Sequence, residues 1–286
     1  MARTCVYKRV ADCEIKGELH PIDEQQAPLL VYIHGGGLIW GTKSDMNKKQ
    51  IKMYNEAGFN VFSIDYRLAP ETKLPGIKED IEDLLIWLYE KAPFDFDREK
   101  IAVVGSSAGG YLALLTGTFT VRPKVIVSLY GYGDVTGDWY QKPSPHYTNM
   151  TAVPEMLAKQ LILKEVISSS PIQKRYAIYL YCRQQGKWLD YVAGNEVSKF
   201  DNFCPIKNID SDFPETLLLH GDADEDVPYE ESVKMKHMLD EANVPNKLIT
   251  IPGGKHSFDI DMDNQTAVQA IESVITYLQK TLIKER

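Results

Sequence analysis

The chain has 286 residues, of which 44% are hydrophobic and 25% charged, so it is long enough for one large globular α/β domain or two small ones. Acidic residues (40) outnumber basic residues (32) and give a formal net charge of -8, which argues against nucleic acid or an anionic membrane surface as the main partner. The N-terminus lacks the apolar segment of a signal peptide, and no stretch approaches the ~20 apolar residues of a membrane span.

The cysteines point to a reduced chain. The four cysteines are Cys5, Cys13, Cys182 and Cys204. They show neither C-x-x-C spacing nor a cluster with histidine. This pattern is typical of a cytoplasmic protein without a zinc site. We therefore expect a cytoplasmic location, with no metal.

Strands and helices alternate in the first ninety residues. Alternating and continuous apolar patterns predict two antiparallel edge strands and then two buried strands, at residues 3–20, 29–33 and 61–64. The strand at 29–33 ends in His34-Gly-Gly-Gly. Thr42 or Ser44 can cap a helix that runs to about residue 55. A second, amphipathic helix is predicted over residues 75–89.

The segment from Ile101 to Leu115 carries the strongest motif. A buried strand over residues 101–104 breaks into Gly-Ser-Ser-Ala-Gly, the pattern G-x-S-x-G, and a helix follows. Strand, tight turn and helix together are typical of a nucleophile elbow, which exposes a serine hydroxyl above the end of a sheet. The frame selects Ser107 rather than its neighbour Ser106. The alternative is a glycine-rich turn without chemistry.

The second half of the chain contains a long insertion between strands. After a strand at 125–129 we expect helices over residues 154–167 and 171–185, within a helical cap at 132–213 that belongs to a single domain of residues 1–286. Strands at 216–219 and 247–251 then alternate with helices, the last of which begins at Asp261 or Asn264. This order predicts an α/β fold, a mainly parallel sheet flanked by helices on both faces, with the cap inserted after the sixth strand.

Four motifs follow directly on predicted strands: His34-Gly-Gly-Gly, Ser107, Asp224 and His256. The carboxyl ends of parallel strands form one edge of the sheet, where ligands bind. A serine hydroxyl needs a base, which His256 can supply, and an aspartate can orient the imidazole. Asp224 is the predicted orienting residue, with Asp222 or Asp226 as alternatives.

An acyl-transfer site also needs donors for an oxyanion, and backbone N–H groups of Gly36, Gly37 and Ala108 are the candidates. Trp40 lies just after this loop and is either a wall of an acyl pocket or a core residue. Tyr179 belongs to a group of cap aromatics that could line a substrate pocket or pack as core.

Together these motifs resemble α/β-hydrolases of the carboxylesterase/lipase group. His34-Gly-Gly-Gly, Tyr66-Arg-Leu-Ala-Pro-Glu and Gly105-Ser-Ser-Ala-Gly-Gly are similar to hormone-sensitive-lipase-like esterases. The acid segment from His220 to Pro228, HGDADEDVP, instead resembles prolyl-oligopeptidase-like and feruloyl/acetyl-esterase-like hydrolases. That resemblance places the acid at Asp224. It also implies a structural ion-pair network at Asp65, Arg67 and Glu71. From their positions at the start of the oxyanion and acid loops, we expect His34 to brace its loop by hydrogen bonds and His220 to be structural.

The expected function is hydrolysis of small-molecule carboxylic esters with short acyl chains, through an acyl-enzyme and without metal or organic cofactor. The alternatives are an amide, peptide or aryl-formamide hydrolase of the same fold, or a catalytically silent binding protein. The sequence leaves open whether the protein forms a homodimer.

Overall fold

The protein is described by a computed structural model that covers residues 2–194 and 197–283. Eight strands form one sheet in the order β1-β2-β4-β3-β5-β6-β7-β8. The strands β1 and β2 pair antiparallel with each other, β2 pairs antiparallel with β4, and the remaining neighbours are parallel. The strand bounds are Arg3–Val10, Cys13–His20, Leu29–Ile33, Asn60–Ile64, Ile101–Ser106, Val125–Leu129, Glu215–Gly221 and Asn246–Ile251 for β1 to β8.

Helices cover both faces of this sheet. One face packs against α2 (Leu74–Glu90), α3 (Ala108–Thr116) and α9 (Glu230–Glu241), and the other against α1 (Lys48–Glu56) and α10 (Gln265–Leu278). The alternation of side chains along β3 explains why both faces are apolar: its odd-numbered residues join the first hydrophobic cluster and its even-numbered residues the second. The predicted α/β-hydrolase architecture is confirmed.

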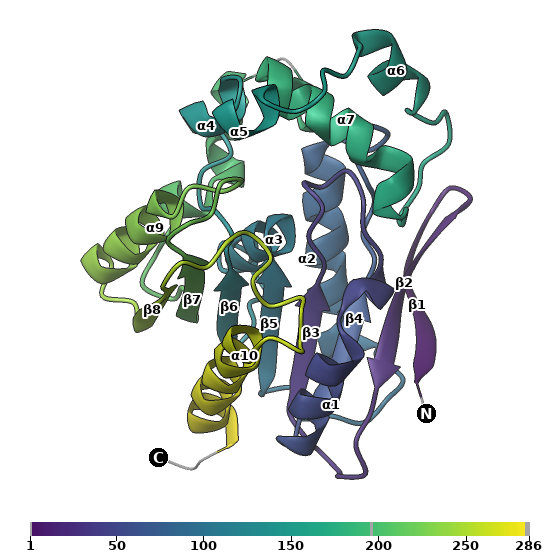
Figure 1. The fold of residues 1–286 in the computed structure, drawn as a ribbon. Helices are drawn as coiled ribbons and strands as arrows, with labels where there is room; N and C mark the ends of the chain where they lie inside the picture. Colours follow the sequence, from purple (N-terminus) through teal and green to yellow (C-terminus); the bar gives the residue numbers. More distant parts are fainter. Residues whose placement is uncertain (1, 195–196, 284–286) are drawn as a thin grey trace.

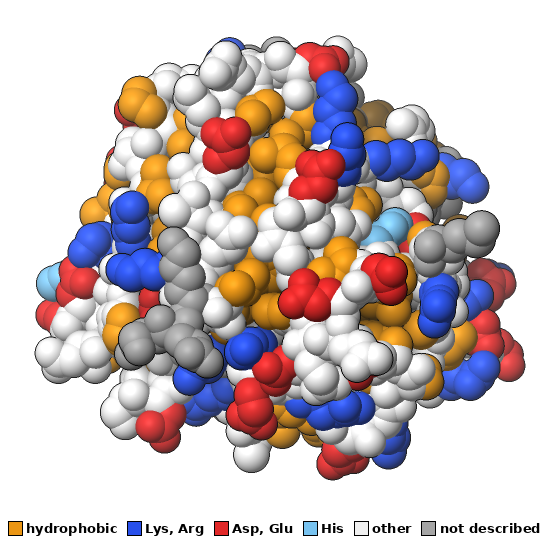
Figure 2. Space-filling model, turned by 90° about the horizontal axis from the view of Figure 1, so that it is seen from below, with side chains coloured by type: hydrophobic (Ala, Val, Ile, Leu, Met, Phe, Trp, Pro, Cys, Tyr) orange, Lys and Arg blue, Asp and Glu red, His pale blue; other side chains and the backbone are white. Residues whose placement is uncertain are grey.

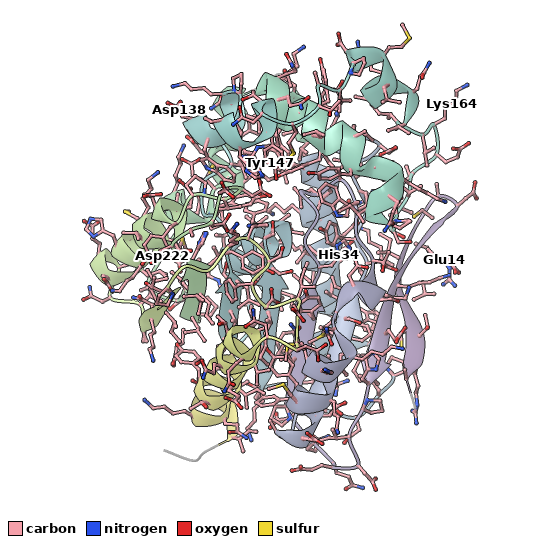
Figure 3. All side chains as sticks on the ribbon, in the orientation of Figure 1. Glu14, His34, Asp138, Tyr147, Lys164 and Asp222 are labelled. Carbon is pink, nitrogen blue, oxygen red and sulfur yellow. The ribbon has the colours of Figure 1, made fainter. Side chains whose placement is uncertain are left out.

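The residues between β6 and β7 form a helical layer above the carboxyl ends of the strands (Figure 1). Its helices are α4 (Asp138–Gln141), α5 (Pro145–Thr148), α6 (Glu155–Gln160), α7 (Ile172–Gln185) and α8 (Trp188–Val192), followed by two 3-10 turns, Val197–Phe203 and Pro205–Lys207. In Figure 3, Tyr147 lies on the side of this layer that faces the strand ends. Side chains of the layer, including Tyr179 and Trp188, belong to the same hydrophobic cluster as the sheet.

Two local expectations are wrong. The helix expected over residues 154–167 ends at Gln160, because the following backbone bonds to distant loops: Leu163 N–H donates to Glu71 Oε1 at 2.7 Å, and Ser170 pairs with Gly41. Thr42 caps the 3-10 turn Lys43–Asp45 rather than α1, which is capped by Asn47. Of the two residues proposed to begin the last helix, Asn264 is the cap.

The face opposite the cap carries acidic and basic side chains of both signs, interspersed with apolar ones (Figure 2). Within the part of the chain that the structure describes, no helix has both the length and the apolar character that crossing a membrane requires.

Candidate active site

Ser107 occupies the tight turn between β5 and α3. Its backbone has φ 55° and ψ -119°, a conformation that non-glycine residues rarely adopt and that is often found at functional sites. The turn closes only because its flanking residues lack side chains: a Cβ at Gly105 would lie 2.0 Å from Gly109 O, and one at Gly109 would lie 2.1 Å from Ile33 O. The predicted elbow is therefore present, with Ser107 at its apex.

His256 links Ser107 to Asp224. Its Nε2 lies 3.0 Å from Ser107 Oγ, and its Nδ1 lies 2.7 Å from Asp224 Oδ2. The Asp224 side chain is fully buried, and its Oδ1 accepts the backbone N–H groups of Asp226 (2.8 Å) and Val227 (3.0 Å). Because an ionised carboxylate can only accept, Nδ1 carries the proton and Nε2 is free to accept from the serine hydroxyl.

The three candidate aspartates have different positions. Asp222 Oδ1 accepts the N–H of Gly253 at 2.6 Å, whereas Asp224 contacts His256 Nδ1. Asp226 lies beside the opposite nitrogen, with its Oδ2 3.6 Å from His256 Nε2. The imidazole thus has a carboxylate near each of its nitrogens.

These contacts set the charge states. Burial disfavours the carboxylate of Asp224, but hydrogen bonds from His220 and His256 outweigh this and hold its pKa well below the usual range. Burial likewise disfavours the imidazolium of His256, and the carboxylates of Asp226 and Asp224 outweigh it, so the pKa of His256 is raised. The arrangement therefore stabilises a cationic imidazolium when Nε2 takes a proton.

The loop after β3 contains backbone N–H groups that are available as hydrogen-bond donors. Gly36 and Gly37 have φ +98° and +60°, and the Gly36 carbonyl accepts the N–H groups of Ile39 and Trp40 at 2.9 and 3.1 Å. Within residues 2–194 and 197–283, the N–H groups of Gly36, Gly37 and Ala108 have no hydrogen-bond partner. Ala108 is the first residue of α3, where the backbone N–H groups and the helix dipole favour negative charge.

A cavity of about 200 Å³ joins these groups. Its lining includes Ser107, His256, Gly36 and Gly37, together with Trp40 and Tyr179, whose rings meet edge to face at 5.0 Å. The two aromatic residues proposed for a substrate pocket are therefore at the cavity. A larger hollow of about 720 Å³ lies between β8 and α10 and includes none of the predicted site residues.

Two further histidines form hydrogen bonds within the loops next to the site. His34, which lies at the end of β3 (Figure 3), places Nδ1 2.8 Å from Gly35 O and stacks on Tyr66 at 4.4 Å. His220 is completely buried and has Nδ1 2.7 Å from Ser232 Oγ and Nε2 3.0 Å from Val227 O. The imidazole that contacts Ser107 is that of His256.

The expected network at Asp65, Arg67 and Glu71 is divided into separate ion pairs. Asp65 binds Lys43, Arg67 binds Asp80 and Glu79, and Glu71 binds Arg175 of α7. Arg175 was not among the residues predicted from the sequence. Trp188, one of the cap aromatics, donates its Nε1–H to Gly37 O at 2.9 Å. Both attach the cap to the loop that carries Gly36 and Gly37.

Arg183, which was not predicted from the sequence, belongs to a group of side chains next to His256. Arg183 and Tyr179, one turn apart on α7, both bond to Asp226 Oδ1. Their i, i+4 spacing was a signal for a shared face, but their partner lies 43 residues or more along the chain. All four cysteines are free thiols, and the described residues contain no group of three or more His, Cys, Asp or Glu side chains arranged to hold a metal ion.

Comparisons with known proteins agree with this fold. The chain is 27% identical to the non-reducing polyketide synthase trt4 of Aspergillus terreus, over 94% of this chain and 14% of the synthase; it thus spans about one seventh of that relative's length. Two solved structures are similar in fold: an alpha/beta hydrolase superfamily protein from Enterococcus faecalis (23% identity, 98% and 99% of the two chains, TM-score 0.81) and an esterase from Pyrobaculum calidifontis (21%, 99% and 86%, TM-score 0.77). The BD-FAE family model matches residues 19–239, and the chain therefore belongs to the BD-FAE family of α/β-hydrolases.

Proposed function

We propose that the protein is a serine hydrolase that cleaves carboxylic esters through an acyl-enzyme, with Ser107 as nucleophile, His256 as base and Asp224 as the residue that orients the imidazole. The observation that carries the proposal is the continuous chain of contacts from Ser107 Oγ to His256 Nε2 (3.0 Å) and from His256 Nδ1 to Asp224 Oδ2 (2.7 Å). This is the geometry that makes a serine hydroxyl nucleophilic near neutral pH.

In the first half-reaction, the Ser107 proton moves to His256 Nε2 while Oγ attacks the ester carbonyl carbon. The resulting oxyanion is held by the N–H groups of Gly36, Gly37 and Ala108, which have no competing partner among the described residues. Nε2–H then protonates the leaving oxygen, and the C–O bond breaks. A water molecule, deprotonated by His256, attacks the acyl-enzyme and releases the acid and free Ser107.

The size of the cavity supports small acyl groups. Its volume of about 200 Å³ is below the ~300 Å³ at which drug-sized ligand sites usually begin. Tyr179 and Trp40 line it with large rings, and a Cβ at Gly37 would already lie 2.5 Å from the Tyr179 ring. An acetyl or propionyl group is therefore the expected acyl part.

The test is hydrolysis of p-nitrophenyl esters from acetate to palmitate. We expect kcat/KM to be highest for the acetate or propionate and to fall steeply for longer chains, because the aromatic walls cannot move without unpacking the cap. An aryl formamide and an anilide are measured in parallel. Turnover of the amides with none of the esters would replace ester hydrolysis by amide hydrolysis, and a preference for long chains would contradict the small pocket.

The pH dependence of kcat/KM should report the raised pKa of His256. The base must be neutral, so activity falls as the pH drops through that raised pKa. Asp226→Asn removes one of the two carboxylates that raise it, while Asp224 and Arg183 stay in place. We expect the acid limb of the profile to move to lower pH in this variant.

The matched control is Glu225→Gln. This substitution also removes one negative charge, but from the neighbouring residue, whose side chain is exposed. Its acid limb should coincide with that of the wild type in kcat/KM measured with p-nitrophenyl acetate. If the acid limb of the pH profile is unchanged in Asp226→Asn, the carboxylate beside Nε2 does not raise the pKa of His256.

A further inference from the structure

Asp226 has one oxygen engaged by the protein and one directed to the reacting groups. Its Oδ1 accepts the Tyr179 hydroxyl at 2.7 Å and also a hydrogen bond from Arg183 Nη1. Its Oδ2 lies 3.6 Å from His256 Nε2, and the Tyr147 hydroxyl is a further hydrogen-bonding neighbour of this carboxylate. Of the two oxygens, Oδ2 is the one beside the reacting nitrogen, where it can accept a hydrogen bond from a bound molecule.

The cap holds this carboxylate in place. Arg183 is 2% exposed; besides Oδ1 it binds the backbone oxygen of Asp226 at 3.0 Å and the Tyr179 hydroxyl at 2.7 Å. Its guanidinium is surrounded by aromatic rings at 5.0–5.6 Å, those of Trp139, Tyr140, Tyr147 and Tyr179. A side chain held this firmly loses little conformational entropy when a ligand binds to its free oxygen.

Of the Asp226–Arg183 ion pair, only the negative member lines the catalytic cavity. Arg183 and Asp226 both line a second hollow, together with Trp139 and Lys142, whereas only Asp226 of the pair also lines the catalytic cavity. The lining of the catalytic cavity includes Asp226 and Asp45, whose carboxylate accepts hydrogen bonds from the N–H and hydroxyl of Thr42. Among the described residues, this lining contains no lysine or arginine. A molecule in this cavity therefore meets the negative end of the pair.

The position of Asp226 identifies the part of the substrate that it meets. In ester hydrolysis, Nε2 gives its proton to the leaving alcohol oxygen, which must come within about 3 Å of Nε2. Oδ2 lies 3.6 Å from that same nitrogen, so a donor group two carbons from the leaving oxygen is within its reach. This inference rests on the proposed ester hydrolysis.

We infer that Asp226 is a specificity-determining residue of the leaving-group side, and that the substrates are esters whose alcohol carries a cationic N–H group near the ester oxygen. A cationic donor gains a charge-assisted hydrogen bond with Oδ2. An alcohol that carries a carboxylate instead meets a like charge that no lysine or arginine of the cavity lining offsets. Esters of neutral alcohols should have kcat/KM values between those of the cationic and the anionic esters.

Three acetates of nearly equal shape test this inference: 2-(dimethylammonio)ethyl acetate, 3-methylbutyl acetate and 2-carboxyethyl acetate. Acetic acid release is measured by titration at a pH on the plateau of the activity profile, where the amine is protonated. We expect wild-type kcat/KM for the cationic ester to exceed that for the neutral ester by about 10- to 100-fold, the range of hydrogen bonds to charged groups, and the anionic ester to be the poorest. Acetylcholine, a cation without an N–H, separates charge attraction from hydrogen bonding.

Asp226→Asn should remove most of this preference, because the amide keeps an oxygen for Arg183 and Tyr179 but loses the charge. Glu225→Gln, which changes net charge equally, should keep it. The preference is the ratio of kcat/KM between two esters hydrolysed by the same variant. Any effect of the substitution on His256 changes both values equally and cancels in this ratio. A wild-type enzyme that hydrolyses p-nitrophenyl acetate but shows no preference for the cation, or whose preference survives Asp226→Asn, overturns the inference and leaves the proposed function intact. Failure to hydrolyse p-nitrophenyl acetate would contradict the proposed function.

Discussion

Replacing Ser107 by alanine should lower kcat/KM for p-nitrophenyl acetate by at least about 10⁴-fold, because members of a nucleophile–base pair act as a unit. The loss should come without loss of fold. Among the described residues, Ser107 Oγ bonds only to His256 Nε2, and alanine adds no atom to the strained turn. Activity is measured with the purified variant, beside its circular dichroism spectrum and its thermal unfolding midpoint.

Ser106→Ala is the matched control, since it removes the adjacent hydroxyl of the same motif. Ser106 Oγ lies 3.0 Å from the hydroxyl of Tyr32, whereas His256 Nε2 contacts Ser107 Oγ. This variant should keep a rate at least about 100-fold above that of Ser107→Ala, and a fluorophosphonate should still label it. Near-normal turnover in a folded Ser107→Ala protein would remove Ser107 as the nucleophile.

Replacing Glu71 by alanine should lower the free energy of unfolding by about 3–5 kcal/mol, the cost of leaving one partner of a buried ion pair unpaired. Glu71 and Arg175 are each 2% exposed. Arg175 also donates to Ile39 O at 2.6 Å and to Ala69 O at 2.7 Å, so the same loss should loosen the loop that carries Gly36 and Gly37. We therefore expect kcat for p-nitrophenyl acetate to fall as well. This rate is measured in buffer without urea, at a temperature where the variant is folded.

The chain provides a matched surface pair for comparison. Arg122 and Asp210 also form a two-bonded guanidinium–carboxylate contact, but their side chains are 21% and 52% exposed. Asp210→Ala should cost at most about 1 kcal/mol. Equal losses in urea unfolding for the two variants would show that burial does not set the value of the Glu71–Arg175 pair. In the double variant Glu71→Leu/Arg175→Met much of the stability should return, because no unpaired charge is left.

Much of the architecture was readable in the sequence because it depends on local pattern. Apolar runs such as 29–33 and 101–104 are buried on both faces, so they indicate strands without knowledge of their partners. The turn at Ser107 needs glycines at 105 and 109 because backbone passes within reach of their missing side chains. The placement of four motifs after strands then followed from the parallel order of the sheet.

Distant contacts decided the rest. Leu161 to Ser170 has an apolar, helix-compatible composition, yet its backbone bonds to Glu71, Leu68 and Gly41 instead. The family pattern of HGDADEDVP selected Asp224 as the acid, but nothing in the sequence indicated a role for Asp226 other than that of an alternative acid. The approach of His256 from beyond the last strand places Asp224 at Nδ1 and Asp226 beside Nε2.

By itself, then, the sequence determined the order of strands and helices, the elbow at Ser107 and the edge of the sheet where the motifs meet, because these features follow from periodicity and from backbone sterics within a few residues. The tertiary structure alone placed Asp226 beside the second imidazole nitrogen, and it alone decided how Arg175, Arg183 and Trp188 of the cap hold the site. Those contacts join residues 43 to 151 positions apart, and hydrogen bonds at such separations leave no periodic trace in the chain.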